Sequence, residues 1–453
     1  MDANTVKRQK VRVSTLGCKV NQFESASFIS GFKEQGCELV SAPEEADILV
    51  VNTCAVTARA GQQSRQLIRK LRRSNPEARL LVTGCYAQLT GDELPELVSD
   101  SSLVVIGNAD KHLLVNTALE QGCSVPPVKD VGAAQEICPL PVRRFSGRTR
   151  AYLRIQDGCN NFCSYCIVPY TRGRCRSLPR AEVLAQVDVF VEEGYQELVI
   201  TGINVGKYGL DLTEGESIYS LLETLCHRFP GIRIRLSSVE PAEVNDRLLD
   251  LMTGCANFMP HLHIPLQSGD DGVLMRMRRK YTTETFAEVV ERVRTALPHA
   301  AIGCDILAGF PGEDDRAAEN SLAFLAGLPV TYLHIFPYSL RPDTAAAKFA
   351  DQVPGPVKDA RVARLRELDV QKKVAFYQQH CGTEQRVLLE GGDERAGLLK
   401  GFSENYIPVR CKGATPSVKN LVENSVGSLA GTVVSVRLIE VRGETVFGEI
   451  INP

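Results

Sequence analysis

Residues 155–166 read Ile155-Gln-Asp-Gly-Cys-Asn-Asn-Phe-Cys-Ser-Tyr-Cys166 and overlap an apolar run that predicts a strand over 152–156. The cysteines are Cys159, Cys163 and Cys166, in the pattern C-x3-C-x2-C. A tight loop can direct three such thiolates at one centre, and a [4Fe–4S] cluster held this way keeps one iron without a protein ligand. An open position is typical of a catalytic metal site. A zinc loop completed by a distant Cys or His is the alternative that the spacing leaves open.

The strand before this loop opens a series in which apolar, strand-like runs alternate with helix-like segments. Strands are predicted over residues 152–156, 197–201, 232–237, 261–266, 301–308 and 332–337, and helices lie between them, for example over 181–193 and 284–297. Six such units fall short of an eight-unit barrel, which typically needs ~250 residues. The pattern therefore predicts a partial (β/α)6 barrel, in a domain that spans residues 145–372.

Residues 1–140 hold a second alternating series, with strands predicted over 11–16, 47–52, 79–83 and 103–106 and helices over 21–33 and 57–73. This order predicts a doubly wound, Rossmann-like α/β domain. Cys18, Cys54 and Cys85 each stand just past the end of a predicted strand. Because the carboxyl ends of parallel strands share one crevice, the three cysteines are expected to converge on one site. Three unrelated buried cysteines are the alternative.

The last part of the chain changes character after a long helix predicted over 357–380. Short β-prone runs at 385–389, 406–409 and 432–441 are separated by Gly and Asn, which predicts a small β-barrel within residues 373–453. The other nine cysteines follow no pattern and are interpreted as core or surface thiols: Cys37, Cys123, Cys138, Cys175, Cys226, Cys255, Cys304, Cys381 and Cys411.

Composition narrows the class of protein. The chain has 453 residues, with 52 Lys and Arg against 54 Asp and Glu, so it is not a polycation that coats nucleic acid. Fifteen cysteines without an export signal argue against a disulfide framework. No apolar run approaches the ~20 residues of a membrane helix, so we expect a cytoplasmic protein without a membrane partner. Arginine-rich stretches at 65–73, 143–150, 172–180 and 276–280 are candidates for phosphate contacts.

The motifs together resemble the radical S-adenosylmethionine (SAM) methylthiotransferase family over nearly the whole chain. Besides the loop at 155–166, the matching motifs are TLGCKVNQ (15–22), NTCAV (52–56), TGCYAQ (83–88) and PYTRG (169–173). The resemblance implies that Cys159, Cys163 and Cys166 hold a SAM-cleaving [4Fe–4S] cluster. It also implies a second [4Fe–4S] cluster on Cys18, Cys54 and Cys85, and a TRAM-type, OB-like barrel at the C-terminus. SAM would serve both as methyl donor and as radical source.

The same resemblance implies SAM contacts at the ends of barrel strands, for which an ordinary hydrogen bond inside the barrel is the alternative. The residues concerned are Thr201, Gly202, Asn204, Arg235, Ser237, Glu240, His263 and Gln267.

Within the family, TLGCKVNQ, TGCYAQ and MRRKYT (277–282) resemble the branch that acts on N6-threonylcarbamoyladenosine at position 37 of tRNA. Sister branches act on N6-isopentenyladenosine or on an aspartate of a ribosomal protein. The implied partners are the tRNA anticodon stem-loop, a sulfur donor, and a reductase or flavodoxin-type electron donor. The tail would contact RNA through Lys400, Arg410 and Lys412. Two residues depart from the family pattern: Cys175 replaces a small residue, and Asp343 replaces the usual Gly.

A hypothesis of a different class is a non-catalytic iron–sulfur protein that binds RNA and senses redox state. It requires the clusters but no cleavage of SAM.

Overall fold

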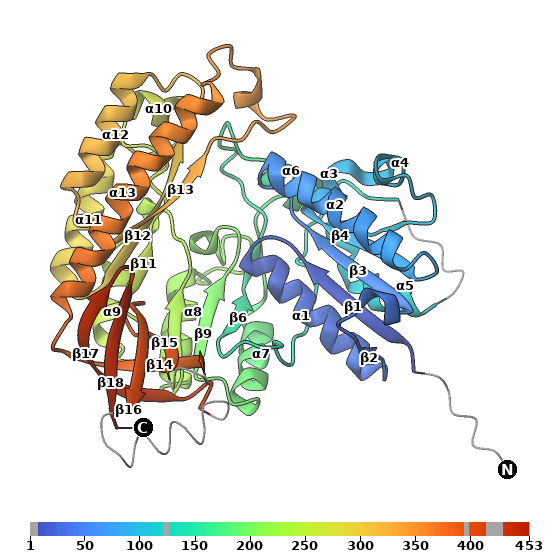
Figure 1. Cartoon of the computed structure of the whole chain (residues 1–453), viewed down its shortest axis with the longest axis horizontal. Helices are drawn as coiled ribbons and strands as arrows, with labels where there is room; N and C mark the ends of the chain where they lie inside the picture. Colours follow the sequence, from blue (N-terminus) through green and yellow to red (C-terminus); the bar gives the residue numbers. More distant parts are fainter. Residues whose placement is uncertain (1–7, 121–126, 394–397, 414–428, 453) are drawn as a thin grey trace.

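The computed structural model describes residues 8–120, 127–393, 398–413 and 429–452. Its N-terminal part is a five-stranded parallel sheet in the order β2-β1-β3-β4-β5 (Figure 1). The strands are β1 (Lys10–Thr15), β2 (Glu38–Leu39), β3 (Ile48–Thr53), β4 (Arg79–Gly84) and β5 (Val104–Val105). The helices are α1 (Lys19–Glu34), α2 (Ala58–Ser74), α3 (Cys85–Thr90), α4 (Leu94–Val98) and α5 (Leu114–Leu119).

Helices cover both faces of this sheet, as expected for a doubly wound fold. Phe23 and Phe28 of α1 share an apolar cluster with Val50 of β3. The neighbouring residue Val51 points to the other face, where Ile68 of α2 packs in a separate cluster. This alternation along β3 follows from the two-residue period of a strand.

The middle part is an open barrel of six parallel strands, arranged as two three-stranded sheets, β6-β9-β10 and β11-β12-β13. Isolated parallel bridges from Ile234 to Phe258 and from Ser238 to His263 join the two sheets. The strands are β6 (Ala151–Arg154), β9 (Glu197–Thr201), β10 (Arg233–Leu236), β11 (His261–His263), β12 (Ala301–Ala308) and β13 (Tyr332–Pro337).

Seven helices accompany these strands: α7 (Arg180–Glu192), α8 (Ile218–Arg228), α9 (Asp246–Gly254), α10 (Asp271–Arg276), α11 (Thr283–Ala296), α12 (Asp315–Gly327) and α13 (Gly355–Gln379). They lie on the outside of the barrel (Figure 1). A short ladder of β7 (Gln156–Asp157) and β8 (Arg176–Ser177), with α6 (Val168–Arg172), frames the loop of the first motif.

The C-terminal part is a closed barrel in the order β14-β15-β16-β18-β17 with an apolar core of its own. Its strands are β14 (Glu384–Asp393), β15 (Leu398–Ser403), β16 (Pro408–Gly413), β17 (Val433–Arg442) and β18 (Thr445–Asn452). The fold class predicted from the sequence, with its three parts, is confirmed. The expected domain boundary between residues 372 and 373 falls inside α13, which is one continuous helix.

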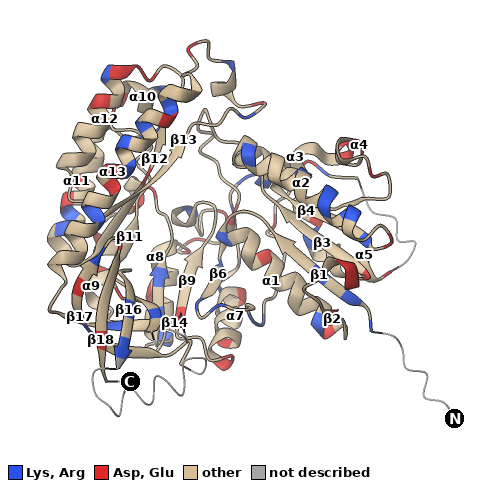
Figure 2. Cartoon of the chain, viewed as in Figure 1, with Lys and Arg blue, Asp and Glu red and all other residues tan. Residues whose placement is uncertain are grey.

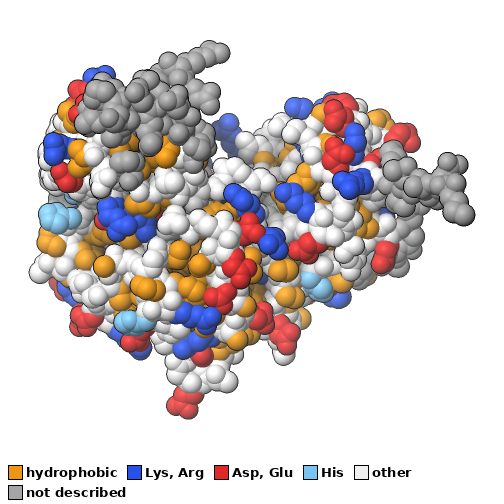
Figure 3. Space-filling model, turned by 90° about the horizontal axis from the view of Figure 1, so that it is seen from below, with side chains coloured by type: hydrophobic (Ala, Val, Ile, Leu, Met, Phe, Trp, Pro, Cys, Tyr) orange, Lys and Arg blue, Asp and Glu red, His pale blue; other side chains and the backbone are white. Residues whose placement is uncertain are grey.

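Charged side chains of both signs are spread over the surface. Lys and Arg occur at several positions along α2 (Figure 2), and in the view from below they alternate with Asp and Glu rather than forming a continuous basic surface (Figure 3). Arg72 of α2 pairs with Asp100 at 2.6 Å. Arg172 and Arg176 are buried, so these two are unavailable to RNA phosphates, contrary to the expectation for the 172–180 stretch.

Candidate functional site

The three cysteines of the N-terminal part lie at the carboxyl ends of adjacent strands. β1, β3 and β4 run side by side in parallel and in register. Cys18 stands directly before α1, Cys54 directly follows β3, and Cys85 is the first residue of α3. The strand-to-helix connections of this fold therefore place all three at one edge of the sheet.

The thiols of these cysteines are close enough to influence one another. Burial raises the pKa of Cys18, and the neighbouring Cys85 raises it as well. Burial raises the pKa of Cys54 to about 11, with smaller contributions from Cys85 and Cys18. Because like charges oppose one another's ionisation only at short range, the structure brings the three sulfurs together.

The surroundings of these thiols suit a bound cluster. Gly17, just before the first cysteine, has a φ of 103°, which favours glycine. A Cβ at Gly17 would lie 3.0 Å from the Cys54 sulfur. The glycine therefore allows the loop that carries Cys18 to lie close to Cys54. Side-chain oxygens of Gln22, Asn52 and Thr83 are buried without a hydrogen-bond partner among the described residues. Three convergent thiols with unfilled polar groups beside them fit a thiolate-held iron–sulfur cluster.

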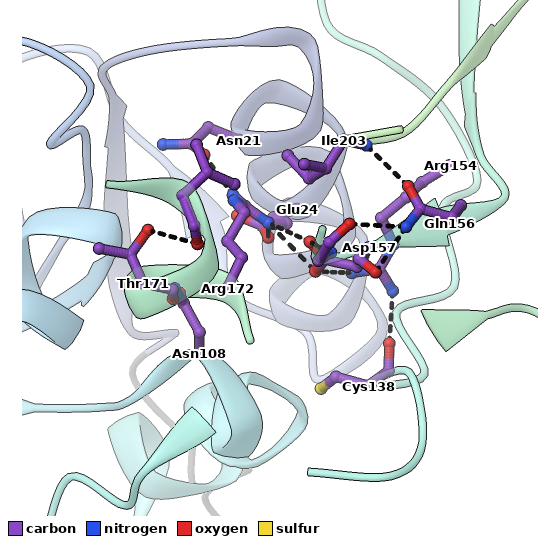
Figure 4. A network of polar contacts seen from close by, with 12 residues as sticks. Asn21, Glu24, Asn108, Cys138, Arg154, Gln156, Asp157, Thr171, Arg172 and Ile203 are labelled. Atoms are coloured by element: carbon purple, nitrogen blue, oxygen red, sulfur yellow. Dashed lines mark hydrogen bonds and ion pairs between the residues drawn. The ribbon is translucent and has the colours of Figure 1, made fainter. Parts of the chain in front are cut away.

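Arg172 of α6 joins this edge of the sheet to the barrel (Figure 4). Its guanidinium is 1% exposed and pairs with Glu24 of α1 at 3.0 Å and with Asp157 of β7 at 3.0 Å. It also donates a 2.6 Å hydrogen bond to the side-chain oxygen of Asn21. Two carboxylates from different parts of the chain thus share one buried cation.

A second buried arginine, Arg341, lies beside Cys54. It belongs to the loop after β13, where the Ser339 hydroxyl accepts a 2.9 Å hydrogen bond from the amide of Ala58 at the start of α2. Arg341 is 5% exposed, and its guanidinium makes no hydrogen bond or ion pair within the described part of the chain. Burial lowers the pKa of Arg341, while Cys54 raises it. An unpaired positive charge therefore stands next to Cys54 of this cysteine set.

The second cysteine set is held in the loop after β7. Gly158 has a φ of 72°, and a Cβ there would lie 1.9 Å from the carbonyl oxygen of Arg174, so only glycine fits at this turn. Burial raises the pKa of Cys166 to about 12, and Cys163 and Cys159 contribute to the increase. The loop therefore gathers its three thiols as the C-x3-C-x2-C spacing predicts, and this donor set fits a [4Fe–4S] cluster.

Polar side chains from other segments of the barrel contact this loop. Arg279 donates a 3.3 Å hydrogen bond to the sulfur of Cys163, and the Asn204 amide lies 3.8 Å from the sulfur of Cys159. The Gln156 oxygen accepts a 2.7 Å hydrogen bond from the backbone of Asn204, which holds the stretch after β9 against the loop. Sequence reasoning did not single out Gln156, and it assigned Arg279, as part of the 276–280 stretch, to phosphate contacts.

The predicted SAM-contacting residues divide into two groups. The end of β9 and the stretch after it lie next to the cysteine loop, because Gln156 bonds to the backbone of Asn204. This segment holds Thr201, Gly202 and Asn204. Glu240 pairs with Arg279 beside that loop, and the Asn161 amide donates to it at 3.4 Å. For these residues SAM binding stays a prediction that is compatible with their positions.

Among the remaining predicted SAM contacts, the side chains of Arg235 and His263 bond to other residues of the chain, and SAM binding at Ser237 and Gln267 stays a prediction. Arg235 pairs with Glu197 at 2.7 Å. His263 contacts Asp305 at 2.9 Å. Ser237 is buried, with its amide bonded to β9, and Gln267 lies between β11 and α10, bonded through its backbone to β12. Cys175 accepts a 3.1 Å hydrogen bond from Gln156, and Cys123 lies outside the described residues.

Comparisons with known proteins agree with this arrangement. Residues 10–106 match the uncharacterized protein family UPF0004, and residues 153–325 match the radical SAM superfamily. The threonylcarbamoyladenosine tRNA methylthiotransferase of Bacillus subtilis is 37% identical, with 91% of this chain and 92% of that protein covered. The enzyme of the same name from Aquifex aeolicus is also 37% identical, with 89% and 97% covered. The chain belongs to the radical SAM tRNA methylthiotransferase family.

Other relatives of this family are more distant. The tRNA-2-methylthio-N(6)-dimethylallyladenosine synthase of Oceanobacillus iheyensis is 32% identical, with 92% of this chain and 81% of that protein covered. Among solved structures, the radical SAM methyltransferase TsrM from Kitasatospora setae aligns with a TM-score of 0.55 at 14% identity, covering 75% of this chain and 77% of that one. This likeness shows a common fold.

Membership establishes the chain as a radical SAM enzyme, which implies a [4Fe–4S] cluster and SAM. The prediction of this family from the sequence is confirmed, and the non-catalytic sensor is set aside. Among the described helices, none combines the length and the apolar composition needed to cross a lipid bilayer.

Proposed function

We propose that this enzyme converts N6-threonylcarbamoyladenosine beside the tRNA anticodon to its 2-methylthio derivative. The observation that carries the proposal is a set of five relatives, from five bacteria, that bear this substrate in their names at 35–37% identity. The relatives named for the dimethylallyl substrate are 31–32% identical. The two convergent cysteine sets support the same conclusion, because each fits a cluster with an iron left open for a reactant.

In the proposed mechanism, Cys159, Cys163 and Cys166 would hold one [4Fe–4S] cluster with SAM, and Cys18, Cys54 and Cys85 would hold a second cluster. When bound, these groups supply the 5′-deoxyadenosyl radical, the methyl group and the sulfur. The C2–H bond of adenine is not acidic, so radical abstraction replaces a general base.

This chain's own residues then orient the reactants and balance charge. Arg279 donates to Cys163 and pairs with Glu240, which places a fixed cation beside the first cysteine set. Asn204 is held by Gln156 at the end of β9. Arg341 supplies a positive charge next to the second set. Such preorganised charges cost no rearrangement during the reaction.

The tRNA is proposed to present its substrate base already unstacked, since anticodon-loop bases need little unpairing. Lys400 and Arg410, opposite one another on β15 and β16, and Lys412 are exposed and available to the RNA backbone. A sulfur donor, a reductase or flavodoxin-type electron donor and a cytoplasmic location complete the proposal.

Nucleoside mass spectrometry of tRNA tests this function, using a strain that lacks the gene and is complemented with wild type, Cys159→Ala or Cys85→Ala. We expect 2-methylthio-N6-threonylcarbamoyladenosine to return only with wild type. Recovery of the isopentenyl analogue instead would retain the chemistry and change the substrate. No change in any tRNA nucleoside would refute a tRNA substrate.

A further inference from the structure

The inner face of the barrel carries a continuous row of polar side chains on its last three strands. The Tyr332 hydroxyl lies 2.8 Å from His261 Nε2 and 3.1 Å from His263 Nδ1. Asp305 Oδ1 lies 2.9 Å from His263 Nε2 and 3.5 Å from His334 Nδ1. We call these five residues the polar wall.

This wall is unusual because the interior of a parallel barrel is normally filled by branched apolar residues. The alternate residues on the same strands, such as Leu262 and Leu333, belong to the apolar core. The wall begins buried at His261, which is 5% exposed, and ends at His334, whose side chain is 54% exposed. A polar row that opens to solvent is suited to a polar ligand rather than to a sealed internal network.

The buried end of the wall meets a group of cations. The Tyr406 ring lies 4.7 Å from the His261 ring, and the guanidinium of Arg235 lies 4.9 Å from the Tyr406 ring centroid. Burial alone would raise the pKa of Tyr406, but Arg150 and other nearby cations, Lys19 among them, lower it. Positive charge therefore collects where the C-terminal barrel closes the interior.

Lys19 differs from the arginines of this group in having no counter-charge. Arg235 pairs with Glu197 at 2.7 Å, and Arg150 pairs with Glu390 at 2.8 Å. Although Lys19 is an exposed residue, the surrounding chain partly buries its ammonium and lowers its pKa, and the group makes no hydrogen bond or ion pair with any residue the structure describes. Its place in the chain, directly after Cys18, puts this free cation next to the N-terminal cysteine set.

We propose that Lys19 and the polar wall bind the threonylcarbamoyl substituent of the substrate, an inference that rests on the function proposed above. This substituent carries a carboxylate, a hydroxyl and an amide-like carbamoyl group. Lys19 pairs with the carboxylate, and His334 and Asp305 bond to the hydroxyl and carbamoyl groups. This gives His263 a supporting role in the wall instead of the expected contact with SAM.

The same arrangement accounts for selectivity against an isopentenyl substituent. An apolar group of similar length would strip water from Lys19, Asp305 and His334 without replacing the lost hydrogen bonds. Sites built to hydrogen-bond a polar substrate reject the analogue that lacks those groups by factors of about 10⁴. The wall is thus a specificity-determining feature.

The experiment compares binding and turnover of anticodon stem-loops by anaerobically reconstituted, full-length enzyme. The RNAs carry N6-threonylcarbamoyladenosine, its carboxylate methyl ester, or unmodified adenosine. Lys19→Met and His334→Leu alter exposed side chains, so both variants should fold. Lys33→Met, at the exposed far end of the same helix, is the matched control.

We expect Lys19→Met to raise the dissociation constant for the threonylcarbamoyl RNA by about tenfold or more, as for a lost charge-assisted hydrogen bond. Binding of the ester and of unmodified RNA should be unchanged, and so should SAM binding. His334→Leu should weaken the binding of both modified RNAs, the threonylcarbamoyl RNA and its methyl ester. Lys33→Met should match wild type in every assay.

Each other outcome has a definite meaning. If wild type acts on threonylcarbamoyl RNA and Lys19→Met binds it as tightly as wild type does, the inference is wrong and the proposed function stands. If wild type acts only on isopentenyl RNA, the proposed function itself fails. Because the ligand atoms of His263, Asp305 and His334 lie within 4.8 Å of one another, a metal is also tested. Zinc or iron retained after replacement of all six cluster cysteines would overturn the inference.

Discussion

Replacing Arg172 with Met should destabilise the protein more than any exposed substitution, because it leaves two buried carboxylates without their shared cation. Glu24 and Asp157 each lie 3.0 Å from the Arg172 guanidinium. Removing one partner of a buried ion pair typically costs ~3–5 kcal/mol. Lys111 still pairs with Glu24, and Arg154 lies 3.8 Å from Asp157. We therefore expect the lower end, a loss of about 3 kcal/mol in the free energy of unfolding.

Urea unfolding followed by circular dichroism measures this loss, since the chain has no Trp for fluorescence. Arg73→Met, on the exposed side of α2, is the control and should change stability by less than ~0.5 kcal/mol. Arg172→Lys should also be destabilising, because an ammonium cannot reproduce the planar fork that serves three acceptors. An Arg172→Met protein within ~1 kcal/mol of wild type would refute the argument that these carboxylates depend on Arg172.

The same pair predicts a pH dependence. Burial alone would raise the pKa of Glu24 and of Asp157, but Arg172 lowers both. A carboxyl whose pKa is lower in the folded state contributes stability above its unfolded pKa of about 4 and loses it as the pH falls further. Wild type should therefore lose stability steeply below about pH 4, and Arg172→Met should lose less over the same range.

Three further changes have expected outcomes. Cys85→Ala should remove roughly half of the bound iron after anaerobic reconstitution. Equal iron content in wild type and in Cys85→Ala would exclude a cluster at the N-terminal set. Arg341→Met should leave the cluster-free protein as stable as wild type or more so, because it removes an unpaired buried charge, yet lower iron retention where Cys159, Cys163 and Cys166 are absent. Unchanged iron retention would mean that Arg341 does not help to hold the cluster. Asp343→Gly should raise the free energy of unfolding slightly, by up to about 1 kcal/mol, and with it the thermal midpoint, since Asp343 has a φ of 68°; a drop would mean that the Asp343 side chain has a role of its own.

Much of the fold could be predicted because the strands of both α/β parts are strongly apolar. The runs at 197–201, 301–308 and 332–337 match β9, β12 and β13 residue for residue. The C-terminal barrel was harder to predict. β15 and β18 were missed because Gly401 and Gly448 interrupt them, and a Cβ at either would meet backbone of a neighbouring strand.

The cysteine sets could be predicted because each depends on local spacing after a strand. The groups around them could not, since long-range packing sets their contacts. Arg341 and Cys54 are far apart in the chain, and only the loop after β13 joins them. Arg172 stands in a recognisable motif, but its charge alone suggested an RNA contact. Its burial depends on Glu24 from α1, which the sequence pattern does not reveal.

One apolar cluster runs without interruption from Phe23 of α1 through Phe145 to Phe190 of α7. Parts joined by a large hydrophobic contact do not hinge, unlike domains that meet at small polar interfaces. We therefore expect the spacing between the two cysteine sites to stay nearly constant. If both sites act on one substrate, as proposed above, we expect the substrate rather than the protein to move between them.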